Sequence, residues 1–174
     1  MIPRTLFSSE HELFRESVRT FLEKHAAPFH GQWEKQGYID RSLWNQAGEA
    51  GMLCSHLPEE YGGLGADFLY SAVVIEEISR LGLTGIGFSL HSDIVAPYIL
   101  HYGSEALKQK YLPKLISGEM VTAIAMTEPG AGSDAASLKT TAMRDGEFYV
   151  LNGSKAFISG AGATELLVVM ARTG

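Results

Sequence analysis

The sequence predicts an α+β fold, with an all-α helical bundle over residues 1–120 and an antiparallel β-domain that starts at residue 121. The first observation is a helical recurrence of apolar residues from residue 9 to about residue 118. The second is a drop in period near residue 120, after which β-branched and aromatic residues fill short runs. The third is a pair of turn dipeptides, Asp145-Gly146 and Asn152-Gly153, which are typical of tight hairpins. Because the last apolar run ends close to residue 174, we expect the domain over 121–174 to be incomplete.

The first two helices are predicted from residues that begin and end them. Ser9 followed by Glu12 indicates a capping box, and the helix that follows is expected to end before Pro28. Asp40 is the predicted cap of a second helix, which Gly51 ends.

Three further helices are expected before the change of period. Asp67 is the predicted cap of a helix that Gly82 ends. The segment 84–103 is apolar nearly all round, which indicates a helix enclosed by the others and interrupted at Pro97. Ser104 is the predicted cap of the last helix, which Pro113 is expected to bend or divide.

Five short strands are predicted in the β-domain, joined as an antiparallel meander. The turn dipeptides separate the second strand from the third and the third from the fourth, so that two hairpins follow one another. The strands are expected over residues 121–127, 138–144, 147–153, 154–160 and 164–171.

Composition excludes several classes of function. With 14 basic and 20 acidic side chains and a pI near 5.5, the chain has no positive field, so we expect no nucleic-acid partner. No apolar run approaches the roughly 18 residues of a membrane span, so stable membrane insertion is not expected. Cys54 is the single cysteine and is expected to be a buried, inert thiol. The polar N-terminus lacks the apolar run of a secretory signal, so a cytoplasmic protein or the mature form of an organellar one is expected.

Several chemically suggestive residues are interpreted as structural. His91 and His101 have no carboxylate or thiol at metal-ligand spacing, so no metal site is predicted. Glu76 and Glu77 are assigned to an exposed helix face. Lys155 is interpreted as a strand-edge lysine, with attraction of a phosphate as the alternative. The tryptophans and phenylalanines have helical spacing and are expected in the core, among them Trp33 and Trp44.

The glycine loop over residues 125–142 leaves two interpretations open. Gly130, Gly132 and Ala135 satisfy G-x-G-x-x-A, but a strand rather than a helix is predicted to follow, so a Rossmann site is rejected. One remaining interpretation is a loop whose backbone amides bind a phosphate. The other is an ordinary turn with Glu128 in solvent.

Two motifs in this order resemble the acyl-CoA dehydrogenase family. They are MTEPGAGSD and, about twenty residues later, LNGSKAFIS. The LPEEYGGLGAD loop, the HYGSEALKQKYLPKLISGE helix and the LKTTA strand extend the resemblance over nearly the entire chain. The opening segment RTLFSSEHELFRESVRTFLEKHAAP and the segment GFSLHSDIVAPYI are most similar to the long-chain branch.

The resemblance implies an FAD flavoenzyme with an N-terminal helical domain, a middle β-barrel and a C-terminal four-helix bundle. This sequence supplies the first domain, over residues 1–120, and the start of the antiparallel β-barrel, over residues 121–174. By the same resemblance, the complete protein oxidises the α,β bond of a fatty acyl-CoA to the trans-2-enoyl-CoA. It passes the electrons to electron-transferring flavoprotein and forms a homotetramer.

The resemblance also implies roles for individual residues. Thr127 is expected at the pyrimidine side of the flavin, the stretch 130–133 at the pyrophosphate, Phe157 beside the ring and Ser159 near flavin N5. The full set of implied cofactor-binding residues is Ile124, Ala125, Met126, Thr127, Gly130, Ala131, Gly132, Ser133, Phe157, Ile158 and Ser159.

The implied substrate-binding residues are Ser133, Gly87 and His91. Small residues at Gly85 and Gly87 favour a deep tunnel for the acyl chain, and a simple helix start explains them as well.

Three departures from the family pattern limit what this chain is expected to do. Gly160 stands where the family more often has asparagine. No position corresponds to the family's catalytic glutamate, so no catalytic residue is assigned and the 174-residue chain alone is expected to be inactive. The C-terminal residues that bind the adenosine part of FAD in the family are missing as well, so FAD retention by this chain is expected to be weak or absent. The alternatives are a non-catalytic binding module with the same fold and an acyl-CoA oxidase.

Overall fold

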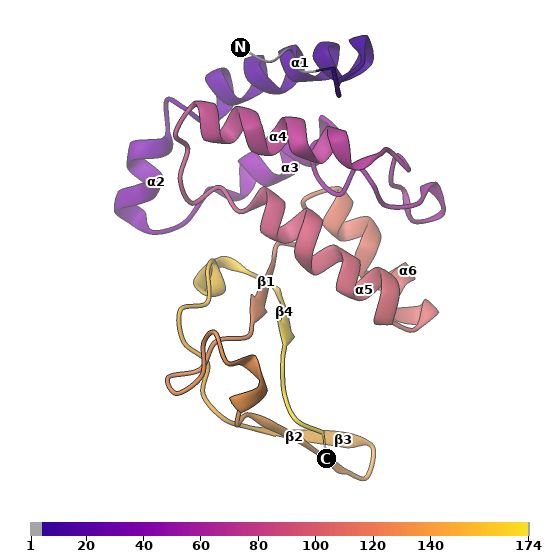
Figure 1. The fold of residues 1–174 in the computed structure, drawn as a ribbon, viewed down its shortest axis with the longest axis vertical. Coiled ribbons are helices and arrows are strands. Elements are labelled where there is room, and N and C mark those ends of the chain that lie inside the picture. The colour runs from indigo at the N-terminus through magenta and orange to yellow at the C-terminus, as the bar shows by residue number, and fades with distance from the viewer. Residues whose placement is uncertain (1–4, 174) are drawn as a thin grey trace. The chain divides into compact units, whose positions relative to one another are not determined.

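The computed structural model describes residues 5–173, and the chain divides into two compact units, Met1–Val121 and Thr122–Gly174 (Figure 1). The first unit consists of helices and the second of short strands and irregular segments. The predicted α+β class is therefore confirmed. Residues 1–4, which belong to the predicted first domain, lie outside the described residues.

The first helix, α1, spans Ser9–His25, close to the predicted range. Its cap is one residue earlier than predicted, because the Ser8 side chain accepts a hydrogen bond from the N–H of His11. The His11 ring in turn contacts the Ser8 N–H, which completes a capping box without Glu12.

A second helix, α2, was not predicted from the sequence. It spans His30–Gln36, begins at Phe29 without a side-chain cap and ends at Gly37, whose φ is 83°. Packing rather than local sequence stabilises so short a helix, since its Trp33 is buried in the core.

The next elements are α3 (Arg41–Glu49), the 3-10 turn η1 (Glu59–Tyr61) and α4 (Phe68–Arg80). Asp67 caps α4 as predicted, through a hydrogen bond from a backbone N–H of the first turn. Asp40 occupies the N-cap of α3, but its side chain accepts a hydrogen bond from the side chain of Gln36, the last residue of α2, instead.

The enclosed segment forms a π-helical turn, η2 (Leu90–Val95), followed directly by α5 (Ala96–Tyr102). The helix is therefore interrupted one turn before Pro97, the position that the sequence predicted. Pro97 occupies the first turn of α5, where a missing N–H costs no intrahelical hydrogen bond.

The last helix of the unit, α6, spans Glu105–Ile116. The Ser104 side chain caps it by accepting from the N–H of Leu107, as predicted. Pro113 lies inside α6 without dividing it. Among the described residues, no helix is long and apolar enough to cross a membrane.

The core of the helical unit includes both tryptophans, as predicted. Trp44 packs edge-on against Phe88 with ring centroids 4.9 Å apart. The buried cluster contains Val18, Leu22, Ala26, Trp33, Leu43, Trp44, Ala47, Met52, Leu53, Val73, Val74, Leu83, Ile86, Phe88 and Val121.

The β-unit contains two separate two-stranded sheets. Strands β2 (Thr141–Asp145) and β3 (Phe148–Asn152) form the predicted antiparallel hairpin. Because Asp145 pairs with Phe148, the turn residues are Gly146 and Glu147, one position later than predicted. Strands β1 (Thr122–Ala125) and β4 (Leu166–Val169) pair in parallel.

The prediction of a five-stranded antiparallel meander was wrong in two respects. The β1–β4 pair is parallel, because the intervening chain carries β4 back alongside β1 in the same direction. The predicted strand over 154–160 does not form, so there is no second hairpin at Asn152-Gly153. Phe157 has a φ of 57°, a conformation that a strand does not accommodate. Short 3-10 turns, η3 (Ala135–Ser137) and η4 (Ala161–Ala163), complete the unit.

Candidate functional site

The glycine loop begins directly after β1 with a tight turn. The N–H of Glu128 donates to the carbonyl of Ala131 at 2.9 Å, and the N–H of Ala131 donates back at 3.1 Å. This reciprocal pair fixes the loop and buries Ala131, whereas Gly130, Gly132 and Ser133 are exposed. The ordinary turn is therefore present, and it leaves Gly130, Gly132 and Ser133 exposed to solvent.

The exposed part of the loop is open to a ligand. A Cβ atom added at Gly130 or Gly132 would meet no atom within 4 Å. Within residues 5–173 the structure assigns no acceptor to the N–H groups of Gly132 and Ser133. Unpaired amides beside small residues can approach and bind an anion such as a phosphate.

Glu128 is buried at the base of the loop, so the turn interpretation was wrong in placing it in solvent. Its carboxylate accepts hydrogen bonds from the N–H of Lys139 at 2.7 Å and of Thr140 at 2.9 Å. The Lys155 ammonium forms an ion pair with it, with an Nζ–Oε1 distance of 2.9 Å. Hydrogen bonding by Thr140, then by the Lys139 N–H and by Lys155, lowers the pKa of Glu128 to about 2.

The second implied flavin segment contacts the first. The N–H of Ala156 donates to the carbonyl of Thr127 at 2.9 Å. Lys155 Nζ donates to the carbonyl of Met126 at 2.8 Å. Lys155 is thus neither a strand-edge residue nor a free cation for a phosphate. The structure brings the segments around Thr127 and Ser159 together, although they are some thirty residues apart in the sequence.

The three residues after Ala156 differ in exposure. The Phe157 side chain is 93% exposed and its backbone has a positive φ. Ile158 is half-buried and Ser159 is exposed. A bulky residue held in the left-handed region costs about 1 kcal/mol or more and is found preferentially at functional sites, so Phe157 is a strong candidate for ligand contact.

Arg172 fixes the far side of the glycine loop. Its guanidinium donates to the carbonyl oxygens of Ala136 and Leu138, and its N–H donates to the carbonyl of Thr140 at 2.8 Å. The loop is therefore held at both ends, by Glu128 on one side and Arg172 on the other.

The implied substrate-binding residues differ in accessibility. Ser133 is exposed on the glycine loop, and Gly87 is half-buried in the helical unit near the Trp44 ring. His91 is 0% exposed, and its Nε2 lies 3.0 Å from the Leu115 carbonyl oxygen. Burial lowers the pKa of His91 to about 4. His91 thus belongs to the core of the helical unit.

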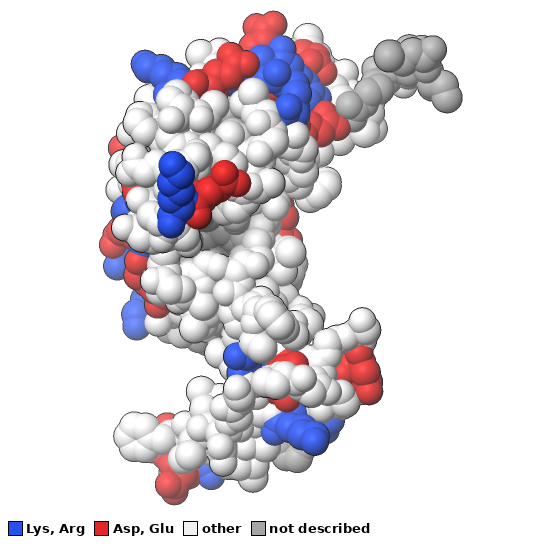
Figure 2. Space-filling model, turned by 90° about the vertical axis from the view of Figure 1, so that its left-hand side faces the viewer, with Lys and Arg blue, Asp and Glu red and all other residues white. Residues whose placement is uncertain are grey.

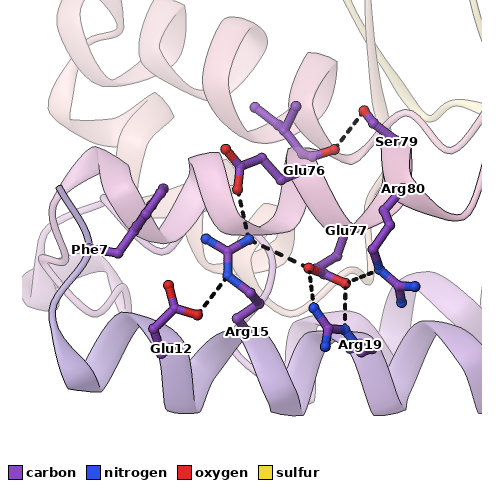
Figure 3. Close-up of a pocket in the computed structure, with 9 residues that line it drawn as sticks. Phe7, Glu12, Arg15, Arg19, Glu76, Glu77, Ser79 and Arg80 are labelled. Atoms are coloured by element: carbon purple, nitrogen blue, oxygen red, sulfur yellow. Dashed lines mark hydrogen bonds and ion pairs between the residues drawn. The ribbon is translucent and has the colours of Figure 1, made fainter. Parts of the chain in front are cut away.

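The assignment of Glu77 to an exposed helix face was wrong. Glu77 is only 2% exposed, and its carboxylate binds Arg19 at 3.0 Å and Arg80 at 2.7 Å. Figure 3 shows that Arg15 also points toward it from α1. The ion pair with Arg19, opposed by burial and assisted by Arg80, lowers the pKa of Glu77 to about 2.

These side chains line a surface hollow of about 520 Å³. Its arginines are matched by carboxylates, as the short Arg15–Glu76 contact of 2.7 Å illustrates. The hollow therefore offers no excess charge to a ligand. We interpret its ion pairs as structural contacts that hold α1 against α4.

Other candidate sites receive no support in the described part of the chain. Residues 5–173 contain no group of three or more potential metal ligands. Burial raises the pKa of the Cys54 thiol to about 12, so the prediction of an inert cysteine is confirmed. On the face shown in Figure 2, basic and acidic side chains are interspersed rather than gathered by sign.

Sequence reasoning missed the pairing of Glu128 with Lys155. A signal was present, because the motif MTEPGAGSD contains two acidic residues, Glu128 and Asp134, and the motif LNGSKAFIS contains one basic residue, Lys155. Whether such residues are buried depends on the tertiary fold, which a single sequence does not supply.

Comparisons with known proteins agree with this geometry. The chain matches "Acyl-CoA dehydrogenase, N-terminal domain" over residues 8–119 and "Acyl-CoA dehydrogenase, middle domain" over residues 123–174. It is 48% identical to the mitochondrial long-chain specific acyl-CoA dehydrogenase of Rattus norvegicus, over 98% of this chain and 40% of that protein. This chain thus spans about 40% of the length of that relative.

Solved structures lead to the same family. An acyl-CoA dehydrogenase from Geobacillus kaustophilus superposes with a TM-score of 0.93 at 50% identity, over 97% of this chain and 44% of that one. An acyl-CoA dehydrogenase complexed with FAD from Bacillus anthracis superposes with a TM-score of 0.89 at 39% identity, over 97% of this chain and 29% of that one. From its two matched domains and these likenesses, the chain belongs to the acyl-CoA dehydrogenase family.

Proposed function

We propose that this chain is the flavin-binding and substrate-binding part of an FAD-dependent acyl-CoA dehydrogenase. The complete protein would oxidise the α,β bond of a long-chain fatty acyl-CoA to the trans-2-enoyl-CoA and pass the electrons to electron-transferring flavoprotein. The 48% identity to a long-chain specific relative supports the chain-length preference. We further propose that the complete protein acts as a homotetramer in the cytoplasm.

The observation that carries the proposal is the hydrogen bond from the Ala156 N–H to the Thr127 carbonyl at 2.9 Å. It makes neighbours of the two segments that the family resemblance assigns to one cofactor. Had the fold separated these segments, the assignment of Thr127 and Ser159 to one ring would have failed.

The residues of the β-unit fit the chemistry of FAD. Unpaired amides at Gly132 and Ser133 suit a pyrophosphate, and the absence of neighbours around a Cβ at Gly132 leaves room for it. The exposed aromatic ring of Phe157 suits the face of an isoalloxazine. FAD, when bound, would supply the acceptor for the hydride that leaves the substrate β-carbon.

The contribution of the chain's own residues would be binding and polarisation. The hydroxyls of Thr127 and Ser159 would donate hydrogen bonds to polar atoms of the ring, where negative charge grows during reduction. Rigid placement of these donors matters because their orientation is then fixed before the reaction begins. The remaining implied cofactor contacts, Ile124, Ala125, Met126, Gly130, Ala131 and Ile158, would complete the cradle.

For the substrate we propose contacts with Ser133 and Gly87. Ser133 is exposed and carries a hydroxyl suited to a polar part of the CoA thioester. Gly87, as a small residue in an apolar helical unit, would leave space for the acyl chain. The full burial of His91 argues against direct contact with a substrate.

The proposal is tested by FAD titration of the complete gene product, followed through flavin fluorescence. We expect saturable binding that Gly132→Val weakens by about tenfold or more, because the added side chain fills the space beside the amides. Gly31→Val is the control. A Cβ at Gly31 also meets no atom within 4 Å, but Gly31 belongs to α2 and not to the glycine loop. Equal FAD affinity of Gly132→Val and the unchanged chain would contradict the assignment of the loop.

The catalytic half of the proposal needs the complete gene product. Anaerobic addition of a long-chain acyl-CoA should bleach the visible absorbance of its bound flavin, whereas a non-catalytic binding module would leave it unchanged. Rapid formation of peroxide on reoxidation in air would instead identify an acyl-CoA oxidase.

A further inference from the structure

The segment that follows β3 has no strand partner, so other contacts must hold it in place. Lys155 and Ala156 contact three consecutive residues of the first flavin segment. The ammonium of Lys155 donates to the carbonyl of Met126 and to the carboxylate of Glu128, and the Ala156 N–H donates to the carbonyl of Thr127 between them. The two segments are thus joined on both sides of Thr127.

Both members of the ion pair are buried. The Lys155 side chain is 12% exposed and that of Glu128 is 7% exposed. Lysine and glutamate are rarely buried to this extent unless they are paired, because removing the charge from water is costly. The Glu128 carboxylate is saturated by further donors, the N–H groups of Lys139 and Thr140. One carboxylate therefore connects the start of the glycine loop, its end and the second flavin segment.

The position of this pair relates it to the proposed cofactor contacts. Thr127 lies next to Glu128 in the chain, and Phe157 and Ser159 follow Lys155 by two and four residues. An apolar pair of similar size would stabilise the fold about as well as a buried ion pair. Unlike an apolar pair, the ion pair fixes the orientation of the Lys155 side chain, because its ammonium donates to both the Met126 carbonyl oxygen and the Glu128 carboxylate.

We infer that Glu128 and Lys155 are positioning residues that hold the Thr127 and Ser159 hydroxyls at the separation required by the flavin ring. This inference deepens the proposed function and depends on it for the identity of the ligand. Neither residue need touch the cofactor, since each acts through the backbone of its neighbours.

The test compares Lys155→Met with a control variant, Lys24→Met. Methionine keeps most of the length of the lysine stem and removes the donors, and Lys24 is an exposed lysine at the end of α1. Amide hydrogen exchange is measured by NMR without flavin, with the amides of the helical unit as internal reference. FAD affinity and the visible spectrum of the bound flavin are measured on the same substitutions in the complete gene product.

We expect Lys155→Met to accelerate exchange of the Ala156 amide and to weaken FAD binding by about tenfold or more, the loss typical when residues that support a site are removed. The flavin spectrum should shift as well, because the donors around the ring are displaced. Lys24→Met should match the unchanged chain in all three measurements. If Lys155→Met lowers the stability of the β-unit, the double variant Glu128→Gln/Lys155→Met removes the unpaired charge, and it is expected to fold but still to bind FAD weakly.

Each result decides between the alternatives. Unchanged exchange at Ala156 would overturn the inference, and so would faster exchange with unaltered FAD affinity and spectrum. Normal FAD binding by the double variant would also overturn it, because the pair would then be structural alone. A complete gene product that bound no FAD, while the Ala156 amide still depended on Lys155, would contradict the proposed function and leave the joining of the two segments established.

Discussion

At the scale of single residues, buried charges organise both units of this protein. In the helical unit, Glu77 binds arginines from α1 and from its own helix. In the β-unit, Glu128 binds Lys155 and two backbone N–H groups. Sequence reasoning assigned Glu77 to an exposed helix face, and one of its two interpretations of the glycine loop left Glu128 in solvent, because glutamate is exposed in most proteins. Only the folded chain brings their partners, which are distant in sequence, to the same place.

The role of Glu77 can be tested by Glu77→Gln. We expect a loss of about 2 kcal/mol in the unfolding free energy at neutral pH, below the full cost of breaking a buried pair because Arg19 and Arg80 remain partly solvated. Urea denaturation followed by circular dichroism measures it. Glu49→Gln, on an exposed position of α3, is the control and should be nearly neutral.

The same variant should show a defined pH dependence. The pKa of Glu77 is lowered from 4.5 to about 2, so its carboxylate stabilises the folded state above its ordinary pKa. That contribution is lost as the pH falls through the folded value. The stability difference between Glu77→Gln and the unchanged chain should therefore shrink from about pH 5 to about pH 2. A constant difference over this range would contradict the assigned role.

At the scale of elements, close backbone packing decides where helices meet. Gly48 lies in α3, and a Cβ atom there would collide with the backbone of Ser117, just after α6. Gly31 lies in α2, where a Cβ would meet nothing within 4 Å. Two helical glycines thus have opposite environments, which the sequence does not distinguish.

Alanine substitution should separate the two glycines. Gly48→Ala is expected to lower the unfolding free energy by about 1–3 kcal/mol, because backbone cannot move aside as a flexible side chain would. Gly31→Ala is expected to raise it by about 0.5–1 kcal/mol, through the lower entropy of the unfolded chain. Thermal unfolding of both variants measures the difference, and similar shifts of the same sign would refute the packing argument.

At the scale of the whole molecule, the two units differ in how much they bury. Among the described residues, the largest fully buried side chains lie in Met1–Val121, whereas every residue of β3 is exposed. Burial of apolar surface is the main source of stability, so the β-unit should be the less stable of the two.

Hydrogen exchange read by mass spectrometry tests this difference. We expect amides of β2 and β3 to exchange at least about tenfold faster than those of α1 and α4 under native conditions. Equal protection across both units would show that the chain unfolds as one cooperative body.

The sequence by itself determined the α+β class, the change of character near residue 120, the caps at Asp67 and Ser104 and the hairpin of β2 and β3. These features depend on hydrophobic periodicity and turn-forming residues, which can be recognised within short segments of the sequence. It also carried the motifs that indicate the family. Tertiary structure alone decided the parallel pairing of β1 with β4, the formation of α2 and the burial of Glu77, Glu128 and Lys155. The physical reason is that each of these features depends on contacts between residues far apart in the chain. The free energy of such contacts cannot be inferred from a local sequence pattern.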